Sequence, residues 1–416
     1  MEKPTVQSII AASENLKNIV DRTPLMRNFG LSHQYETNLY LKREDLQRVR
    51  SYKLRGAYNK ISSLTNNELK RGVVCASAGN HAQGVAYSCA LLNVKGTIFM
   101  PVPTPKQKVK QVEMFGKDNV DIVLIGDTFD DAQLEAIKFC TANKATMVKP
   151  FDDYHIINGQ ATVGKEILED LPEQADYVFL PIGGGGLAAG VATYLKSLSP
   201  ATKIIGLEPE GAPSMQAAIS AGKPVKLQEI DKFVDGAAVQ EAGELTYEIC
   251  KAYLDQVVSI PEGKVCSTIL KLYNEEAIVV EPAGALSVAA LDMFQDEIKG
   301  KNVVCILSGS NNDITRTEEI KERSLLFEGL KHYFIVRFPQ RAGALKEFVN
   351  EVLGPEDNIT HFEYSKKHNR NTGPALVGIE IKHPSLLKGL RLRMEEKKFF
   401  GEYLNDRPDL FQYLVL

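Results

Sequence analysis

An uninterrupted apolar run leads through a small polar turn into a helix in the segment Gly72-Val73-Val74-Cys75-Ala76-Ser77-Ala78-Gly79-Asn80-His81-Ala82-Gln83-Gly84. The run over residues 72–76 is typical of a strand buried on both faces, and a helix is predicted over residues 81–92. The same alternation recurs from about residue 39 to residue 315, with further strand-like runs at Gly96–Met100, Val120–Ile125, Tyr177–Ile182, Lys203–Leu207 and Asn302–Leu307. This order predicts an α/β fold with mostly parallel, twisted sheets and helices on both faces.

Composition places the chain among ordinary globular proteins. It has 416 residues, enough for two or three domains, and 44% of them are hydrophobic and 25% charged. The net charge of −4 argues against a nucleic-acid partner, and no apolar run reaches the length of a membrane span. The six cysteines show no paired spacing and the seven histidines are scattered, so we expect no disulfide framework and no metal site. With no signal peptide at the N-terminus, these features favour a cytoplasmic protein.

The pattern changes near residue 325. The charged segment Arg316–Arg323 is predicted to be an exposed helix or a link, and after it the order strand, helix, strand, strand, helix, strand is typical of a ferredoxin-like domain. The predicted elements are Lys331–Phe338, Ala342–Leu353, Ile359–Tyr364, Ala375–Ile381, Pro384–Lys397 and Phe411–Leu416.

A lysine near the start of a helix is the first candidate for chemistry. Lys53 lies in the segment Arg50-Ser51-Tyr52-Lys53-Leu54-Arg55-Gly56-Ala57. A single lysine is usually a solvated side chain. Here it comes one position before an apolar helix face and after a turn that is expected to face a cleft. A desolvated amine loses its proton more readily, and it can then form a Schiff base with an aldehyde cofactor.

Two turns rich in small residues are candidate anion sites. In the first, Ser77 and Asn80 can add side-chain donors to the backbone N–H groups at a helix N-terminus. An ordinary helix cap explains one such residue. It does not explain Gly79 between them, or Gly84 one turn later, where the backbone must be approached closely.

The second turn contains four consecutive glycines, Gly183–Gly186, followed by Leu187. Glycines permit the geometry in which successive N–H groups converge on a phosphate, and the absence of a following lysine excludes a Walker loop. A dinucleotide site remains an alternative, because Gly184-x-Gly186-x-x-Ala189 fits that fingerprint and Glu208 lies about 20 residues on. Four glycines in a row nevertheless favour a terminal phosphate.

Two further segments have both a structural and a chemical interpretation. Ser308 ends the run Asn302–Leu307, where it is either a turn residue or a neutral hydroxyl facing a cofactor ring nitrogen. A neutral partner there would favour elimination at the β-carbon over transamination. Glu281 begins the segment Glu281–Ala285, and we expect it to cap a helix.

These motifs together resemble those of the threonine dehydratase family, within the tryptophan-synthase-β-like class of pyridoxal-phosphate enzymes. The resemblance covers essentially the whole chain, and the C-terminal stretch resembles a single ACT-like regulatory domain. It implies a two-lobed catalytic domain over residues 1–322 and an ACT-like domain over 326–416. It also implies the conversion of L-threonine to 2-oxobutanoate and ammonia, feedback inhibition by isoleucine, an effect of valine as a further candidate, and a homo-oligomer, either tetramer or dimer.

The resemblance also assigns roles to the candidate residues. Lys53 would hold pyridoxal 5'-phosphate and, once released, remove the α-proton of the substrate. Asn80 would bind the ring hydroxyl of the cofactor, and Ser308 would meet its pyridine nitrogen. The remaining assignments are the cofactor phosphate to Gly183, Gly184, Gly185, Gly186 and Leu187, and the substrate carboxylate to Ser77, Gly79 and Asn80.

Three departures from the family pattern matter. Ala78 replaces the serine that racemising relatives use as an acid–base group, which favours elimination. Ser214 replaces an acid that pairs with Glu208 at a cation site in some relatives, and residues 157–161 also differ. The alternatives are a serine dehydratase or β-replacement enzyme, a non-catalytic amino-acid sensor, and a nicotinamide oxidoreductase.

Overall fold

The computed structural model describes residues 2–364 and 372–415, and it divides into two compact units, Met1–Ile314 and Thr315–Leu416. Within the described ranges, no helix is both long and apolar enough to cross a membrane. The predicted domain division at residues 322–326 falls inside a helix of the second unit.

The first unit is built from strands that alternate with helices, as predicted. Its strands are β1 (Leu25–Arg27), β2 (Asn38–Arg43), β3 (Val73–Ala76), β4 (Gly96–Met100), β5 (Val120–Leu124), β6 (Thr146–Met147), β7 (Tyr177–Pro181), β8 (Lys203–Pro209), β9 (Gln256–Ile260) and β10 (Asn302–Leu307). Its helices are α1 (Val6–Asn15), α2 (Phe29–Gln34), α3 (Lys53–Ser62), α4 (Asn66–Arg71), α5 (Asn80–Leu92), α6 (Lys106–Gly116), α7 (Phe129–Asn143), α8 (Tyr154–Asp170), α9 (Gly186–Leu198), α10 (Ser214–Ala221), α11 (Glu244–Tyr253), α12 (Glu262–Glu276), α13 (Pro282–Ala289) and α14 (Gln295–Ile298).

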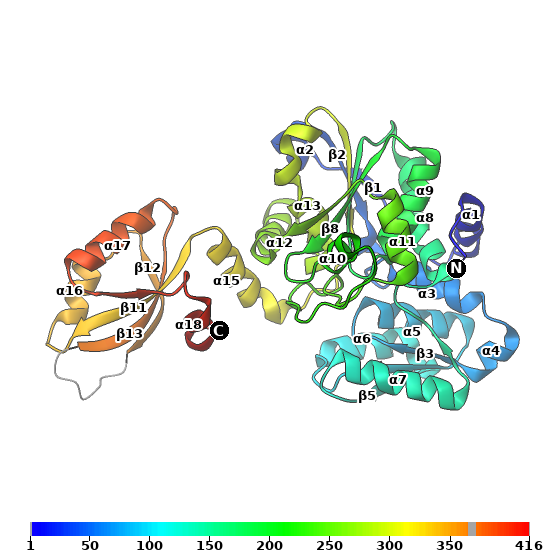
Figure 1. Ribbon diagram of the computed structural model, residues 1–416, viewed down its shortest axis with the longest axis horizontal. Coiled ribbons are helices and arrows are strands. Elements are labelled where there is room, and N and C mark those ends of the chain that lie inside the picture. The colour runs from blue at the N-terminus through cyan, green and yellow to red at the C-terminus, as the bar shows by residue number, and fades with distance from the viewer. Residues whose placement is uncertain (1, 365–371, 416) are drawn as a thin grey trace. The chain divides into compact units, whose positions relative to one another are not determined.

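The larger lobe of this unit contains a six-stranded sheet in the order β1-β2-β10-β7-β8-β9. All neighbouring pairs are parallel except β1 with β2. Helices α8, α9 and α11 cover one face and α12 and α13 the other, as Figure 1 shows. Helices on both faces explain why β7 is apolar and buried along its whole length.

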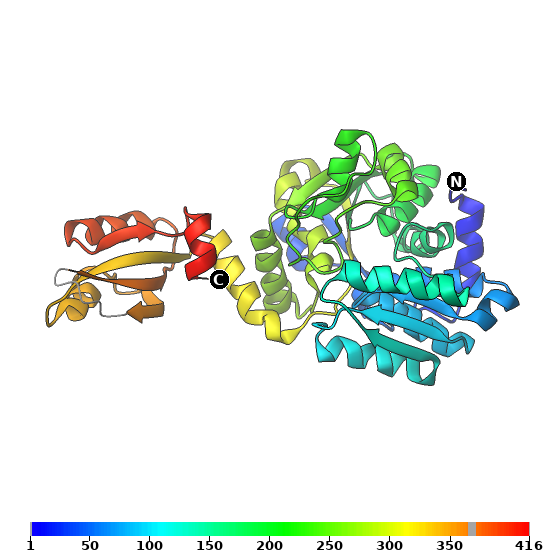
Figure 2. The same ribbon diagram turned by 60° about the horizontal axis from the view of Figure 1, so that its bottom comes forward.

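The smaller lobe is inserted between β2 and β7 and contains a four-stranded parallel sheet in the order β5-β4-β3-β6. Helix α7 packs on one face of this sheet through Ala132 and Ala136, while α5 and α6 pack on the other (Figure 2). Both predicted sheets are therefore confirmed, and the carboxyl ends of β3, β7 and β10 each lead into one of the candidate turns.

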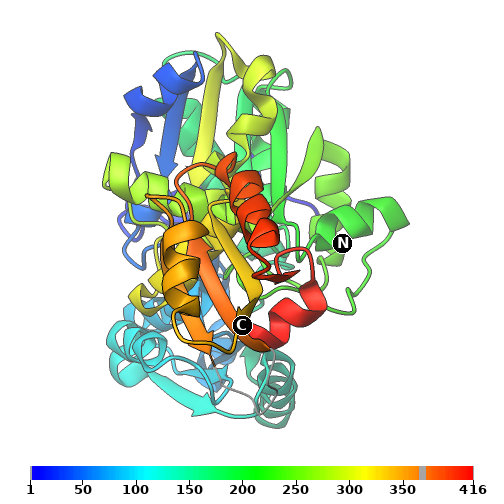
Figure 3. The same cartoon turned by 90° about the vertical axis from the view of Figure 1, so that its left-hand side faces the viewer.

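The second unit has the predicted ferredoxin-like order. It consists of α15 (Thr317–Phe327), β11 (Lys331–Pro339), α16 (Ala344–Glu351), β12 (Asn358–Tyr364), β13 (Thr372–Glu380), α17 (Leu386–Glu396), β14 (Phe400–Tyr403) and α18 (Pro408–Leu414). The antiparallel sheet runs β12-β13-β11-β14. Helices α16 and α17 cover one face of it (Figure 3), where Phe348 and Leu390 pack against Phe334 and Val377.

One predicted element of this unit is wrong. The segment Phe411–Leu416 is predicted to be the last strand, but it is helical up to Leu414, where α18 ends, and Leu416 lies outside the described residues. Pro408 at the first helical position and Asp409 in the first turn favour this helix. The strand that completes the sheet is β14, which pairs antiparallel with β11.

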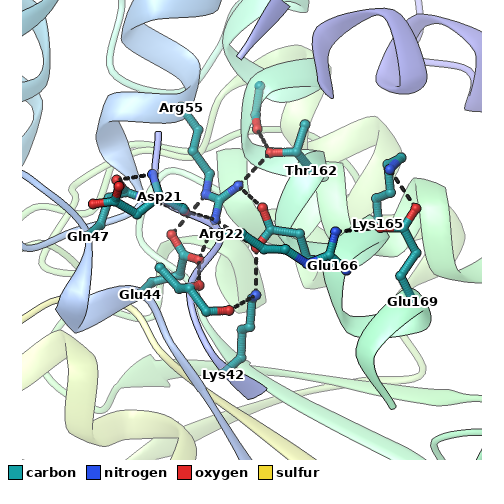
Figure 4. A network of polar contacts seen from close by, with 12 residues as sticks. Asp21, Arg22, Lys42, Glu44, Gln47, Arg55, Thr162, Lys165, Glu166 and Glu169 are labelled. Carbon is teal, nitrogen blue, oxygen red and sulfur yellow. Dashed lines mark hydrogen bonds and ion pairs between the residues drawn. The ribbon is translucent and has the colours of Figure 1, made fainter. Parts of the chain in front are cut away.

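A buried network of charges joins β2 and the turn directly after it to α3 and α8 (Figure 4). Arg55 on α3 donates to both oxygens of Glu44 at 2.7 and 2.9 Å and to both oxygens of Glu166, on α8, at 2.6 and 2.9 Å. Lys42 on β2 donates to Glu166 at 2.6 Å and to the carbonyl oxygen of Thr23 at 2.6 Å. Because Arg55 and Lys42 are both 0% exposed, each depends on these carboxylates for charge balance.

Glycines let α3 and α8 approach closely enough for this network to form. A Cβ on Gly159 would lie 2.5 Å from the carbonyl oxygen of Arg55 and 2.7 Å from the Cα of Gly56. This contact gives a physical reason for a glycine within residues 157–161.

We expect Glu166→Ala to destabilise the protein by about 3–5 kcal/mol, because it leaves Arg55 and Lys42 buried without a shared carboxylate. The measurement is the urea midpoint of the cofactor-loaded protein. Glu169→Ala is the matched control on the same helix: its ion pairs with Arg22 and Lys165 lie at the surface, and we expect a change within about 1 kcal/mol. Equal effects of the two substitutions would contradict the proposed importance of the buried network.

The same network predicts a loss of stability in acid. Burial raises the pKa of Glu166, but the charges of Arg55 and Lys42 outweigh it and hold the pKa below its ordinary value of 4.5. Such a group stabilises the fold above its unfolded pKa, and this contribution disappears as the pH falls through the lower folded value. The difference in unfolding free energy between the wild type and Glu166→Gln should therefore be constant near neutral pH and shrink below about pH 4.5. A difference independent of pH would be inconsistent with this pKa shift.

Candidate active site

The segment before Lys53 lies against the turn that follows β10. The N–H of Tyr52 donates to the carbonyl oxygen of Ser308 at 3.3 Å, and the N–H of Ser310 donates to that of Arg50 at 3.0 Å. An isolated antiparallel bridge joins Ser51 to Gly309. The structure thus brings together the candidate lysine and the candidate serine, which are far apart in the sequence.

Lys53 is the first residue of α3 and is half-buried. Its Nζ lies 5.2 Å from the centre of the Tyr52 ring, and among the described residues it has no carboxylate partner. Gly84 on α5 packs against the backbone of Lys53, where a Cβ would lie 3.2 Å from its carbonyl carbon and oxygen. The close approach predicted at Gly84 is confirmed, and the amine is left available for chemistry.

The turn after β3 is built differently from an ordinary capped helix. Gly79 occupies the N-cap position of α5, and neither Ser77 nor Asn80 caps the helix with its side chain. The N–H of Gly79 donates to the hydroxyl of Ser77 at 3.3 Å. A Cβ on Gly79 would meet nothing within 4 Å, so there is open space beside the turn. The first N–H groups of α5 have no partner within the helix, which suits an anion in that space.

Asn80 is held on both sides of its amide. Its Nδ2 donates to Glu281 at 2.7 Å, and its Oδ1 accepts from Nδ2 of Asn311 at 2.5 Å. The expected capping role of Glu281 is therefore wrong: this residue stands at the N-cap position of α13 but makes no side-chain cap there. Burial raises the pKa of its carboxyl group to about 7 despite the hydrogen bond from Asn80. The sequence signal for this contact was only an acid directly before a proline and an apolar helix.

The four glycines after β7 are required by their surroundings. Gly185 has φ +92°, and a Cβ on Gly184 would lie 2.3 Å from the ring of Phe151. The hydroxyl of Thr246 donates to the carbonyl oxygen of Gly184 at 2.6 Å. Because the initial N–H groups of α9, which begins at Gly186, have no partner within the helix, this loop can bind a phosphate.

The glycine loop lies close to the other two turns. A Cβ on Gly183 would lie 2.9 Å from the carbonyl oxygen of Gly236, and a Cβ on Gly236 would lie 4.0 Å from Nδ2 of Asn80. Ser308, only 2% exposed, completes the group through its contact with Tyr52. The predicted site residues therefore lie in, or at the helix starts directly after, turns that meet near the carboxyl ends of β3, β7 and β10.

Glu208 does not support the dinucleotide alternative. Its two carboxylate oxygens accept from the N–H groups of Met215 and Gln216 at the start of α10, at 2.7 and 2.8 Å. It is completely buried, and burial raises its pKa to about 7. Because this carboxylate is fully buried and turned to the backbone of α10, it is not exposed to a ribose. Among the described residues, no three His, Cys, Asp or Glu side chains are grouped to hold a metal ion.

The residues present fit pyridoxal phosphate. The hydroxyl of Ser51 and Oδ1 of Asn311 are buried and have no hydrogen-bond partner among the described residues. These atoms lie beside Lys53 and Asn80, so a polar ligand there would find unused donors and acceptors. Lys53 supplies an amine for the aldehyde, the glycine loop supplies N–H groups for the phosphate, and Ser308 supplies a neutral hydroxyl.

Comparisons with known proteins agree with this geometry. Residues 16–309 match the family model described as pyridoxal-phosphate dependent enzyme, and residues 322–414 match the C-terminal regulatory domain of threonine dehydratase. The chain is 56% identical over 415 residues to a biosynthetic L-threonine dehydratase of Halalkalibacterium halodurans, covering 100% of both chains. It is 57% identical over 410 residues to that of Bacillus subtilis, covering 99% of this chain and 97% of the relative.

Solved structures give the same relationship. The processed form of threonine deaminase isoform 2 from Solanum lycopersicum superposes with a TM-score of 0.73 at 39% identity, covering 77% of this chain and 95% of that one. With a family model matched over most of the chain and relatives matched over their full length, the chain belongs to the biosynthetic threonine dehydratase family of pyridoxal-phosphate-dependent enzymes.

Proposed function

We propose that this protein is an L-threonine ammonia-lyase, which converts L-threonine to 2-oxobutanoate and ammonia as the first step towards isoleucine. The observation that carries the proposal is the meeting of Lys53, Asn80, Ser308 and the glycine loop in one site. The full-length similarity to biosynthetic threonine dehydratases supports the choice of substrate.

Bound pyridoxal phosphate supplies the electron sink that makes the α-proton of an amino acid removable. The residues that would hold it are Lys53 at the aldehyde, Asn80 at the ring hydroxyl and Ser308 at the pyridine nitrogen. The backbone N–H groups of Gly183, Gly184, Gly185, Gly186 and Leu187 would bind the phosphate.

The substrate carboxylate would bind at the start of α5, to Ser77, Asn80 and the N–H groups near Gly79. This places its α-carbon within reach of Lys53, whose Nζ removes the α-proton. Loss of the β-hydroxyl as water leaves an enamine, and its hydrolysis releases 2-oxobutanoate and ammonia. Ala78 carries no acid–base group, so the turn offers no second proton carrier there for racemisation.

The second unit would control this reaction. We propose that it binds isoleucine as an end-product inhibitor, with valine as a further candidate effector, and that residues 1–322 form the catalytic domain and 326–416 the ACT-like domain. The unit keeps its own core, centred on Phe334, Phe348 and Phe399, which suits a separate binding module. We further propose a cytoplasmic homo-oligomer, a tetramer or a dimer, because ACT-like modules commonly bind effectors at interfaces.

We expect the purified protein to form 2-oxo acid from L-threonine faster than from L-serine, and isoleucine to suppress this turnover. Rates with both amino acids, with and without isoleucine, are the measurement. A preference for serine would favour a serine dehydratase, and a colourless protein without turnover would favour an amino-acid sensor. If a chain lacking residues 326–416 kept both turnover and the isoleucine response, the regulatory assignment would fail.

We expect Lys53→Ala to lose the visible absorption of the bound cofactor and to lower turnover by about 10²–10⁴-fold through loss of the base alone. Lys60→Ala is a matched control on the same helix, because the amine of Lys60 pairs with Asp153 at 2.7 Å and lies outside the site. This control should keep its colour. A yellow, active Lys53→Ala protein would disprove the assigned role.

A further inference from the structure

Glu281 lies at the point where the candidate turns meet, next to Asn80. It is 3% exposed, and its N–H donates to the carbonyl oxygen of Gly309 at 3.1 Å. Gly309 makes room for its carboxyl group, since a Cβ placed on Gly309 would lie 2.4 Å from Oε1, and Gly236 lies in contact distance of the same oxygen, 3.6 Å from the position of a Cβ. The fold therefore brings a buried acid to the edge of the cofactor site.

The hydrogen bonds around Asn80 are consistent with only one orientation of the side-chain amides of Asn80 and Asn311. The carbonyl oxygen of Val49 can only accept, so Asn311 must place its Nδ2 there, at 3.0 Å. The same Nδ2 donates to Asn80, whose amide oxygen must therefore face Asn311. Nδ2 of Asn80 then faces Glu281 and donates one hydrogen to it. Among the described residues, no second acceptor contacts this nitrogen, so its other N–H is available to a ligand.

We propose that Glu281 is a positioning residue, which accepts one N–H of Asn80 and so keeps the other available to the ring hydroxyl of the cofactor. This inference rests on the proposed function, in which Asn80 binds that hydroxyl. A donor facing the hydroxyl stabilises its ionised form, whereas an amide turned by half a rotation would present its oxygen and stabilise the neutral form. Glu281 thereby influences which form of the bound cofactor predominates.

The charge of Glu281 is not required for this role. Its pKa is raised to about 7 by burial, and a carboxyl oxygen can accept from Asn80 in either protonation state. The charged groups that face it are Lys108 on α6 and Asp235 in the loop before α11, which pair with each other at 2.5 Å. The other groups that face Glu281 are uncharged: the side chain of Asn80, after β3, and the backbone N–H of Asn311, after β10.

The test is the visible absorption spectrum of the cofactor-loaded protein, followed against pH. We expect Glu281→Met, which removes the acceptor, to shift the pH of half-conversion between the two cofactor forms upward by about one unit, a tenfold change. Glu281→Gln keeps an acceptor oxygen and should retain most of the wild-type behaviour. If both variants shifted equally, a proton-carrying role would replace the positioning role.

A double substitution shows whether Glu281 acts through Asn80. In an Asn80→Ala background, Glu281→Met should cause no further spectral shift, since the amide to be oriented is gone. Additive shifts would overturn the proposal. Glu276→Met is the matched control, because Glu276 accepts from Nδ2 of Asn28 at 2.7 Å outside the site, and it should leave the spectrum unchanged.

Two further outcomes are distinguishable. If the wild type shows the cofactor spectrum but Glu281→Met leaves it unchanged, the positioning role is wrong and the proposed function stands. If the wild type binds no cofactor, both are overturned. Should Glu281→Met fail to fold, as judged by circular dichroism, the smaller Glu281→Ala, which also removes the acceptor, takes its place in the wild-type and Asn80→Ala backgrounds. A shift of the same size in both would overturn the proposal.

Discussion

The paired charges of Arg55 are the constraint on which the site depends. A buried guanidinium needs its carboxylates, and here one follows β2 and the other lies on α8. Arg55 can form both ion pairs only when the turn after β2 and helix α8 lie on either side of α3. The two ion pairs therefore fix the position of α3. Lys53 lies two residues earlier on the same helix. The charge network therefore determines where the amine proposed to react lies, without contacting the proposed cofactor site itself.

Close backbone approaches impose a second constraint. Gly56 and Gly159 bring α3 against α8, Gly84 brings α5 against Lys53, and Gly309 leaves room for the Glu281 carboxyl group. At each of these positions a side chain would collide with its neighbour or displace it. The small residues of this site thus have two distinct uses: some leave N–H groups free for the proposed ligand, and others let the segments that carry the candidate residues meet.

Local patterns were sufficient to predict β3, β4, β5, β7, β8 and β10 and the turns after them, because each depends on neighbours in the sequence, whereas β1, β6 and β9 were not predicted. The helix at Pro408–Leu414 is not predicted by its apolar residues, because so short an apolar run fits a strand as well as a helix; the signal that favours the helix is Pro408 at its first position. The contact of Glu281 with Asn80 and the role of Arg55 were not predicted at all. Both join distant segments, and a charged residue on a helix is, by pattern alone, indistinguishable from a solvated one.

Two buried acids of the catalytic unit show why burial alone does not identify a functional residue. Glu208 and Glu281 both lie in the interior, and burial raises the pKa of each to about 7. The carboxylate of Glu208 is used by two backbone N–H groups of α10, which is a structural role. Glu281 instead accepts from a side-chain amide that still has an N–H to offer. The two acids differ in their hydrogen-bond donors. A backbone N–H has one hydrogen, which Glu208 already accepts, whereas the amide of Asn80 has a second N–H, so its orientation by Glu281 can affect a bound ligand.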